Sequence, residues 1–401
     1  MRIGFKQTLI NPILPCHMEG YNDRITREIN DDLHLHSLVI DSNKLIVWHV
    51  LDIIMIPNSF SQRIKKRLIK EFMIDEEQIF LTATHTHSGP KVSTYLFPNI
   101  KPDANYLNFL EEKIVENTTY CMNNLKLSTA FYSQIETANL YGNRNNPLTP
   151  YNNRLATIQF RSISGEPLVQ LVNIACHPTV LSHNYTKISS DLFGAFRRFY
   201  EEETGIPLII VNGEGGDIST RYTRKGQDYQ EVKRLGALLS QDLQQATEFT
   251  QLNMDQMDVS VCNYSTEYFP QQDAFMIQLE KFLLQELEKF SLIEPQNALK
   301  DLLQTVRQKL AQEKITYDYQ ATILEANDFR IIFFPGELVT AFGTKLRTVD
   351  KKKSFIAAYT NDFKGYAVNQ EAFGKIPECY TSEFPSGIAD LFIEKIIKEY
   401  R

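Results

Sequence analysis

Short apolar runs and helical apolar spacing alternate along most of this 401-residue chain. Residues 38–56 contain two apolar runs separated by a polar turn at 41–44, which predicts two paired strands. Residues 59–72 then place apolar side chains at helical spacing, and the chain continues into an apolar run at 79–81. The first part of the chain is therefore predicted to form a hairpin, a helix and a strand.

The same alternation continues in the rest of the chain. Further helices are predicted at 106–125, 191–203 and 229–246, and further strands at 130–134, 155–161, 167–175 and 207–211. Strands that alternate with helices indicate an α/β fold, with a mixed β-sheet core flanked by helices. Residues 271–314, rich in Leu, Glu, Gln and Lys at helical spacing, predict a helical hairpin inserted on the outside of the core. We assign no chemistry to that insertion.

Composition narrows the possible classes of protein. Hydrophobic residues make up 43% and charged residues 23% of the chain, as in ordinary globular proteins. The net charge of -7 argues against a nucleic-acid partner bound through its phosphates. No apolar stretch approaches the roughly 20 residues that span a bilayer, and no signal segment opens the chain, so we expect a cytoplasmic protein. The five cysteines lack C-x-x-C spacing and are expected to be reduced and mostly buried.

Two histidines, His85 and His87, come directly after the apolar run 79–81. On a strand, residues two apart point to the same face, so we expect both imidazoles to enter one pocket. Two neutral imidazoles in one pocket suit a divalent metal, or a metal ligand beside a catalytic base. The alternative is a polar strand end with two solvated histidines, because short His-x-His matches are frequent by chance.

A third histidine, His177, also follows an apolar strand and precedes a proline. Because it shares this context with His85 and His87, it is a candidate for the same pocket. A single histidine at a strand end is otherwise a hydrogen-bonded packing residue in most cases. The remaining histidines lack this context and are expected to be peripheral: His17, His34, His36, His49 and His183.

A glycine-rich turn, residues 212–219, follows the predicted strand 207–211. Glycines permit left-handed dihedral angles and let backbone N–H groups approach a ligand, so this turn could hold an anion and a nucleophile. It matches neither a phosphate-binding P-loop nor a dinucleotide fingerprint, and it lacks the Gly-x-Ser-x-Gly elbow of ordinary serine hydrolases. An ordinary turn is the alternative interpretation.

Two further polar residues follow apolar strands near the end of the chain. Glu337 comes after a Pro-Gly turn, and Tyr366 follows the predicted strand 355–359. A carboxylate is a normal zinc ligand, whereas a tyrosine is an unusual one. From the residues alone, Glu337 is more simply a helix N-terminal acid and Tyr366 a half-buried aromatic.

Several segments, in order along nearly the whole chain, resemble the catalytic domain of the neutral/alkaline, non-lysosomal ceramidase family. The hallmark Thr-His-Thr-His-Ser-Gly-Pro motif of that family occurs here at residues 84–90. The other similar segments are 143–147, 175–179, 216–221, 335–337 and 361–371. The resemblance implies that residues 1–401 form one ceramidase-like catalytic domain, with the helical insertion at about 271–314.

The same resemblance implies a zinc enzyme that hydrolyses a linear N-acyl amide in sphingolipid or other lipid metabolism. It assigns four zinc ligands: His85, His177, Glu337 and Tyr366. It also assigns the residues that act on the substrate: His87 and Arg144 at the reacting carbonyl, Ser219 as a nucleophile activated by a zinc-bound water, and Gly216, Asp217 and Tyr380 as substrate contacts. Zinc accepts such nitrogen and oxygen ligands and can polarise an amide carbonyl.

This sequence also departs from the family pattern. Thr220 and Arg221 follow Ser219 where the family has Pro-Asn, and Lys91 follows Pro90 where the family usually has glycine. We therefore expect a more basic pocket rim, and either ceramide or a smaller, more polar amide as the substrate. The chain ends soon after the tyrosine motif, so no C-terminal immunoglobulin-like domain is expected. Two alternatives stay open: a zinc-hydroxide enzyme in which water attacks directly, and a non-catalytic metal-dependent binding protein.

Overall fold

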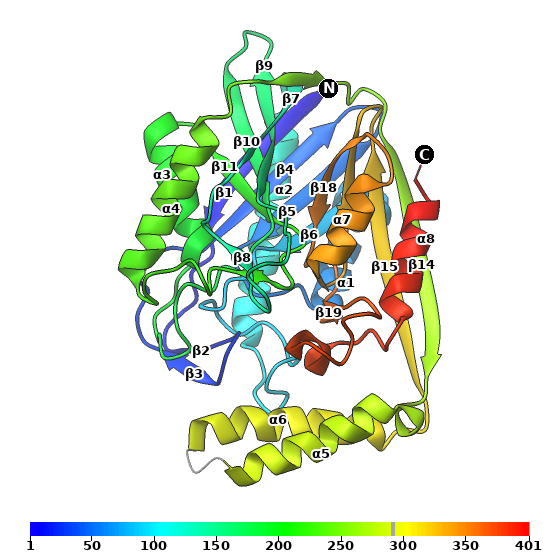
Figure 1. Ribbon diagram of the computed structural model, residues 1–401. Helices are drawn as coiled ribbons and strands as arrows, with labels where there is room; N and C mark the ends of the chain where they lie inside the picture. Colours follow the sequence, from blue (N-terminus) through cyan, green and yellow to red (C-terminus); the bar gives the residue numbers. More distant parts are fainter. Residues whose placement is uncertain (290–292, 401) are drawn as a thin grey trace.

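Most strands of the main sheet are buried on both faces, so each face must be covered by another layer. In the computed structural model, which describes residues 1–289 and 293–400, helices cover one face of this sheet and a second sheet covers the other (Figure 1). Further helices cover the outer face of the second sheet. This arrangement of helices, sheet, sheet and helices confirms the predicted α/β class.

The main sheet has nine strands in the order β11-β10-β9-β7-β1-β4-β5-β6, with β13 paired to β7. Their bounds are β1 Arg2–Leu9, β4 His34–Asp41, β5 Leu45–Leu51, β6 Ile79–Ala83, β7 Lys126–Glu136, β9 Arg154–Ser162, β10 Pro167–Ile174, β11 Leu208–Asn212 and β13 Thr250–Leu252. The sheet is mixed, as predicted, because it contains both parallel and antiparallel pairs. Strand β5 pairs with β6, and β10 with β11, in parallel, whereas β4 and β5 form the predicted antiparallel pair.

The second sheet consists of β14 Asp258–Tyr268, β15 Ile315–Glu325, β16 Phe329–Phe333 and β18 Lys353–Ala357. Its inner face packs on the main sheet through aromatic rings. Phe80 and Phe333 stack with their centroids 3.6 Å apart, and Trp48 meets Phe333 edge-on at 5.0 Å. The sequence pattern did not predict this separate sheet, because its strands read as single apolar runs scattered over the second half of the chain.

Six helices lie where the apolar periodicity predicts them, and two more near the end of the chain were not predicted. The helices are α1 Asn58–Phe72, α2 Ala104–Asn123, α3 Asp191–Thr204, α4 Tyr229–Gln244, α5 Ala274–Lys289, α6 Ile293–Leu310, α7 Thr340–Thr348 and α8 Ile388–Lys398, with short 3-10 helices at Glu76–Gln78, Pro270–Gln272 and Pro377–Thr381. Helices α5 and α6 form the predicted hairpin and lie across one end of the two sheets (Figure 1). Among the described residues, no helix combines the length and the apolar character needed to cross a bilayer.

Three two-stranded ladders complete the fold at this same end of the sheets. They pair β2 Cys16–Met18 with β3 Arg24–Thr26, β8 Gly142–Asn143 with β12 Ile218–Ser219, and β17 Glu337–Leu338 with β19 Tyr366–Ala367. The last two ladders carry residues singled out in the sequence. The five cysteines are unpaired and four of them are buried, as predicted.

Two of the histidines that lack the site pattern lie in the core. His36 on β4 and His49 on β5 are 1% and 0% exposed. The ring of His49 hydrogen-bonds Ser37 Oγ at 2.8 Å, whereas neither ring nitrogen of His36 has a hydrogen-bond partner among the described residues. Burial lowers the pKa of His49 to about 3 and holds the pKa of His36 well below its ordinary value.

These buried imidazoles make stability depend on pH. Burial lowers the pKa of these histidines in the folded state. Their contribution to the free energy of unfolding is therefore complete above the unfolded-state pKa of roughly 6.5 and is lost as the pH falls towards the folded-state pKa. We expect the free energy of unfolding to decrease from pH 7 to pH 5. His36→Phe should reduce the slope near pH 5 by about 1.4 kcal/mol per pH unit, since one proton fewer binds on unfolding.

Denaturant unfolding at a series of pH values measures both slopes. Phe5→Leu is the matched control, because Phe5 stacks on His36 at 6.4 Å and its loss disturbs the same packing without removing a titrating group. If the free energy of unfolding changes with pH equally in the wild type and in His36→Phe, His36 does not have a lowered pKa in the folded protein.

Candidate metal centre

The candidate site lies at the carboxyl ends of the parallel strand pairs, where ligands commonly bind in α/β proteins. His85 follows β6, His177 follows β10, and Glu337 follows β16. The two sheets are tied together at this end because the N–H of Ala358 donates to the carbonyl of Asn212 at 3.0 Å. Residues distant in the sequence are thereby brought to one place.

His85 and His87 share a pocket, as the sequence predicts, but not through strand alternation. Strand β6 ends at Ala83, and His85 adopts a left-handed conformation with φ of 73°. Its N–H donates to the carbonyl of Ile53 at 2.9 Å. The turn brings the Nε2 atoms of His85 and His87 to within 3.1 Å of each other. The prediction of a strand at these positions is therefore wrong, although the imidazoles do meet.

Main-chain carbonyls orient two of the three imidazoles. His85 Nδ1 lies 2.6 Å from the carbonyl oxygen of Ile54, and His177 Nδ1 lies 2.6 Å from that of Gly215. A carbonyl only accepts hydrogen bonds, so each Nδ1 carries the proton and each Nε2 presents a lone pair. This is the arrangement that orients histidine ligands of metals.

Glu337 and Tyr366 are register partners in the parallel ladder of β17 and β19. The ladder needs Gly336, because a Cβ at that position would lie 2.6 Å from the carbonyl oxygen of Gly365. Glu337 Oε2 lies 3.0 Å from His177 Nε2 and 3.5 Å from His85 Nε2. The Tyr366 hydroxyl lies 3.3 Å from His177 Nε2. The structure thus brings the four residues of the implied ligand set together.

The electrostatics of this cluster favour a cation. Burial lowers the pKa of His85 to about 4 and that of His177 to about 3, so both rings are neutral near pH 7. Burial also raises the pKa of Glu337, and His85 and Arg144 oppose that shift. Two imidazole lone pairs and a carboxylate oxygen therefore face one another in a buried space. Nitrogen and oxygen donors of this kind fit Zn²⁺.

His87 differs from the other two histidines. It belongs to a group of three imidazoles, with His85 and His177, whose ligand atoms all lie within 4.8 Å of one another. Its Nδ1, however, is buried without a hydrogen-bond partner among the described residues, so no carbonyl fixes its tautomer. His87 is also less buried than the other two. Its distances allow it to act as a metal ligand or as a donor to a substrate.

Arg144 reaches the cluster from the end of β8. Its Nε donates to Glu378 Oε1 at 2.8 Å, and its Nη2 donates to the Tyr366 hydroxyl at 3.1 Å. Glu378 also accepts from Asn145 at 3.0 Å, which holds the carboxylate in place. Within the described chain, Nη1 of Arg144 has no hydrogen-bond partner, so this donor is left for another molecule.

Ser219 is carried on β12, which pairs with the segment that precedes Arg144. The N–H of Arg144 donates to the carbonyl of Asp217 at 2.8 Å, and the N–H of His177 donates to that of Ile218 at 2.9 Å. The Ser219 hydroxyl, which is buried, accepts from the N–H of Arg221 at 3.2 Å. Two predicted catalytic residues and one predicted ligand are therefore tied to a single ladder.

The glycines of the turn, which the sequence suggested as an anion site, make main-chain contacts. The N–H groups of Gly213, Gly215 and Gly216 all donate to main-chain carbonyls. A Cβ at Gly216 would lie 2.7 Å from the carbonyl oxygen of Leu338. Asp217 is similarly occupied, because its carboxylate accepts from Asn143 and from the N–H and hydroxyl of Thr340. Gly216 and Asp217 thus hold the turn against β17.

The expectation of a more basic rim is wrong for Lys91. Lys91 is 3% exposed, and its ammonium lies 3.3 Å from the buried carboxylate of Glu19. Arg221 is exposed, and its guanidinium donates to the carbonyl of Arg144 at 3.2 Å. Tyr380 packs its ring near Phe275 on α5, at 6.4 Å between centroids, and helps to line a cavity beside α6.

Two residues at the site were missed in the sequence. Tyr359 stacks on His85 at 4.2 Å, and its hydroxyl donates to Glu337 Oε2 at 3.3 Å. Glu378 orients Arg144, as described above. Tyr359 is a polar residue at the end of the predicted strand 355–359, and this position at a strand end is the pattern that marked His85 and His177. No such pattern marks Glu378 in the sequence.

Comparison with known proteins supports the fold. No family model matches the sequence. The crystal structure of the neutral ceramidase from Pseudomonas aeruginosa superimposes with a TM-score of 0.77 at 16% identity, covering 99% of this chain and 74% of that one. A ceramidase complexed with C2 gives a TM-score of 0.76 at 15% identity with the same coverage. The chain therefore has the fold of neutral ceramidases, as its motifs suggested.

The geometry predicts one tight divalent-metal site in each chain. Titration of metal-free protein with Zn²⁺ in a calorimeter should give a stoichiometry of one. His177→Ala should weaken binding by at least about a hundredfold, because it removes a ligand from a fixed set. His49→Gln, at a buried histidine outside the cluster, is the control and should bind like the wild type. Equal affinity for His177→Ala and the wild type would contradict the site.

Proposed function

We propose that this protein is a zinc-dependent hydrolase of linear N-acyl amides, similar to a ceramidase, that releases a carboxylic acid and an amine. The observation that carries this proposal is the convergence of two imidazole Nε2 atoms and the Glu337 carboxylate within 3.5 Å, beside Tyr366. The ceramidase fold, with 99% of the chain covered, supports the assignment.

Zinc bound by His85, His177, Glu337 and Tyr366 would polarise an amide carbonyl and lower the pKa of a water molecule. The chain's own residues supply the remaining contacts. Arg144 is held by Glu378 and Tyr366, and its unbonded Nη1 is available to an oxygen on which negative charge develops. Because the guanidinium is fixed before substrate arrives, little reorganisation is needed during the reaction.

His87 is the imidazole best suited to contact the reacting carbonyl. Burial keeps its pKa well below the ordinary value, so the ring is neutral and has one N–H and one lone pair. Its Nδ1 has no hydrogen-bond partner among the described residues, and its Nε2 lies 3.1 Å from the Nε2 lone pair of His85, so the contact to His85, and not the main chain, sets its tautomer. We assign it a hydrogen bond to the substrate and leave His85 and His177 as ligands.

We assign Ser219 as the nucleophile. Attack of its hydroxyl oxygen on the amide carbon would form an ester to the acyl group as the C–N bond breaks, and the amine would take a proton as it leaves. Water would then cleave the ester, releasing the acid and restoring the serine. The ladder of β8 and β12 supports this assignment, because it holds Ser219 beside the segment that carries Arg144.

A second mechanism, direct attack by water, is favoured by one specific observation. In the part of the chain that the structure describes, no imidazole or carboxylate lies within hydrogen-bond distance of Ser219 Oγ, whose contact is the N–H of Arg221. A serine nucleophile usually has an adjacent side-chain base. In this second mechanism Ser219 only donates a hydrogen bond to the substrate. The third possibility, a metal-dependent binding protein, requires that turnover is absent.

Replacement of Ser219 separates these possibilities. For a serine nucleophile, Ser219→Ala should lower kcat by at least about a thousandfold while zinc content and thermal stability stay near the wild-type values. N-acyl amides of different chain lengths, including ceramide, serve as substrates, and released amine is measured. Ser128→Ala, at another buried serine on β7, is the control and should keep full activity.

Three results would be decisive. A loss of less than about tenfold in Ser219→Ala would contradict the serine nucleophile and support direct attack by water. Absence of hydrolysis by zinc-loaded wild-type protein across the substrates would contradict the hydrolase itself. Hydrolysis that survives in His177→Ala would show that the cluster is not the active site.

A further inference from the structure

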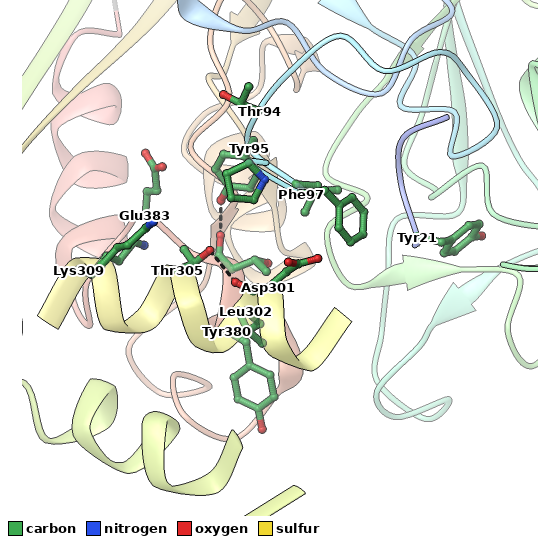
Figure 2. A pocket seen from close by; sticks show the side chains of 14 residues that line it. Tyr21, Thr94, Tyr95, Phe97, Asp301, Leu302, Thr305, Lys309, Tyr380 and Glu383 are labelled. Atoms are coloured by element: carbon green, nitrogen blue, oxygen red, sulfur yellow. Dashed lines mark hydrogen bonds between the residues drawn. The ribbon is translucent and has the colours of Figure 1, made fainter. Parts of the chain in front are cut away.

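A cavity of about 380 Å³ lies between the body of the protein and helix α6 (Figure 2). One wall is formed by Tyr21 and by residues 94–98, including Tyr95 and Phe97. The opposite wall is formed by α6 and by residues 380–383. The helical insertion, to which the sequence assigned no chemistry, therefore forms one wall of this cavity.

Shared side chains connect this cavity to the centre. The ring of Tyr21 lies 4.9 Å from that of His87. On the other side, Tyr95 meets Phe363 at 4.8 Å, and Phe363 in turn stacks towards His85 at 6.2 Å. The wall at 380–383 is tied to the ligand set as well, because Ser382 Oγ donates to the carbonyl of Tyr366 at 2.6 Å. The cavity therefore lies next to the place where a substrate would bind at the candidate metal centre.

Charged groups line the cavity unevenly. Lys309 and Glu383 lie together at one end, where Lys309 Nζ donates to the carbonyl of Ser382 at 3.3 Å and Glu383 lies 3.9 Å from Lys364 Nζ (Figure 2). Burial lowers the pKa of Lys309 and raises that of Glu383, and each charge opposes the shift of the other. These two groups of the lining therefore offset each other.

Asp301 stands apart from that pair, on the side of the cavity nearer Phe97 and Tyr21 (Figure 2). Among the residues that the structure describes, its carboxylate forms no hydrogen bond and no ion pair. Partial burial raises its pKa, and the neighbouring Asp23 adds to the shift while Lys91 opposes it. Burial and Asp23 thus disfavour the ionised carboxylate, and a further positive group beside it would stabilise it.

Two cations beside the aromatic rings on this side of the cavity are engaged elsewhere. Lys91 lies over the ring of Phe97 at 5.7 Å, but its ammonium pairs with Glu19. Arg24 lies over the ring of Tyr21 at 5.0 Å, and its guanidinium donates to the carbonyls of Tyr185 and His87. Neither belongs to the lining. The Asp301 side of the cavity thus offers an acceptor with a formal charge next to apolar rings.

We propose that this cavity receives a part of the substrate that ends in an ammonium group, and that Asp301 on α6 is the residue that selects for it. The proposal rests on the amide hydrolase function and names its substrate class: an N-acyl amide that carries a second, cationic amino group away from the scissile bond. Methylene groups of that part pack on Tyr21, Tyr95 and Phe97, and the ammonium donates to Asp301.

Two matched amides test the selection. N-octanoyl-ethylenediamine carries an ammonium group near neutral pH, and N-octanoyl-ethanolamine has a neutral hydroxyl in the same place. The wild type should hydrolyse the cationic amide with a kcat/KM about tenfold higher than that for the neutral amide. Asp301→Asn should remove most of this preference by raising the KM for the cationic amide. Its kcat/KM for the neutral amide should stay within about twofold of the wild-type value. Glu280→Gln, which removes a charge from α5 outside the cavity, should keep the wild-type preference.

Binding of n-octylammonium, measured by calorimetry with n-octanol as the neutral counterpart, gives a readout that does not depend on turnover. Octylammonium should bind the wild type and Glu280→Gln with equal affinity and bind Asp301→Asn about tenfold more weakly, with octanol unaffected. If both amides are hydrolysed but Asp301→Asn changes neither the preference nor octylammonium binding, the cavity assignment is overturned and the hydrolase stands. If octylammonium binding is lost in Asp301→Asn while no amide is hydrolysed, the cavity assignment stands and the hydrolase is overturned.

Discussion

Two hydrogen bonds from imidazole Nδ1 groups to main-chain carbonyls set the geometry on which the rest of the candidate centre depends. They run from His85 to Ile54 and from His177 to Gly215, each at 2.6 Å. Because they fix the tautomer, both Nε2 lone pairs point at the Glu337 carboxylate. Without them a buried neutral histidine has no preferred ring nitrogen, and the three donors would not face a common point.

Backbone strain at the site is held by the packing of the two sheets. His85, Tyr359 and Asn361 all have positive φ, a conformation that costs of the order of 1–3 kcal/mol for a residue other than glycine. The N–H of Asn361 donates to the carbonyl of Leu81, and the Asn361 side chain accepts from the N–H of Leu81. This clamp fixes the loop after β18 to strand β6. The strained loop thereby places Tyr359 against His85 and Glu337.

The sequence predicted the elements of the fold better than their assembly. Apolar periodicity located helices α1 to α6 closely, because each needs one buried stripe, but it did not predict α7 and α8. It did not separate the second sheet from the first, since pairing between distant strands leaves no local signal. His85, His87 and His177 were found because polar residues at the ends of buried strands are unusual. Glu337 and Tyr366 were identified only through family motifs, because their proximity depends on the parallel ladder of β17 and β19. Glu378 orients Arg144 through a hydrogen bond made only in the folded chain, and the place of Asp301 in the cavity lining likewise depends on the fold.

Anomalous X-ray diffraction from crystals of the zinc-loaded protein, recorded on both sides of the zinc absorption edge, would locate the bound metal directly. Zinc held by this cluster should give one strong anomalous peak in each chain, about 2 Å from the Nε2 atoms of His85 and His177 and from a carboxylate oxygen of Glu337. A peak at any other place in the molecule, with these three side chains unchanged around an empty space, would contradict a metal site at this cluster.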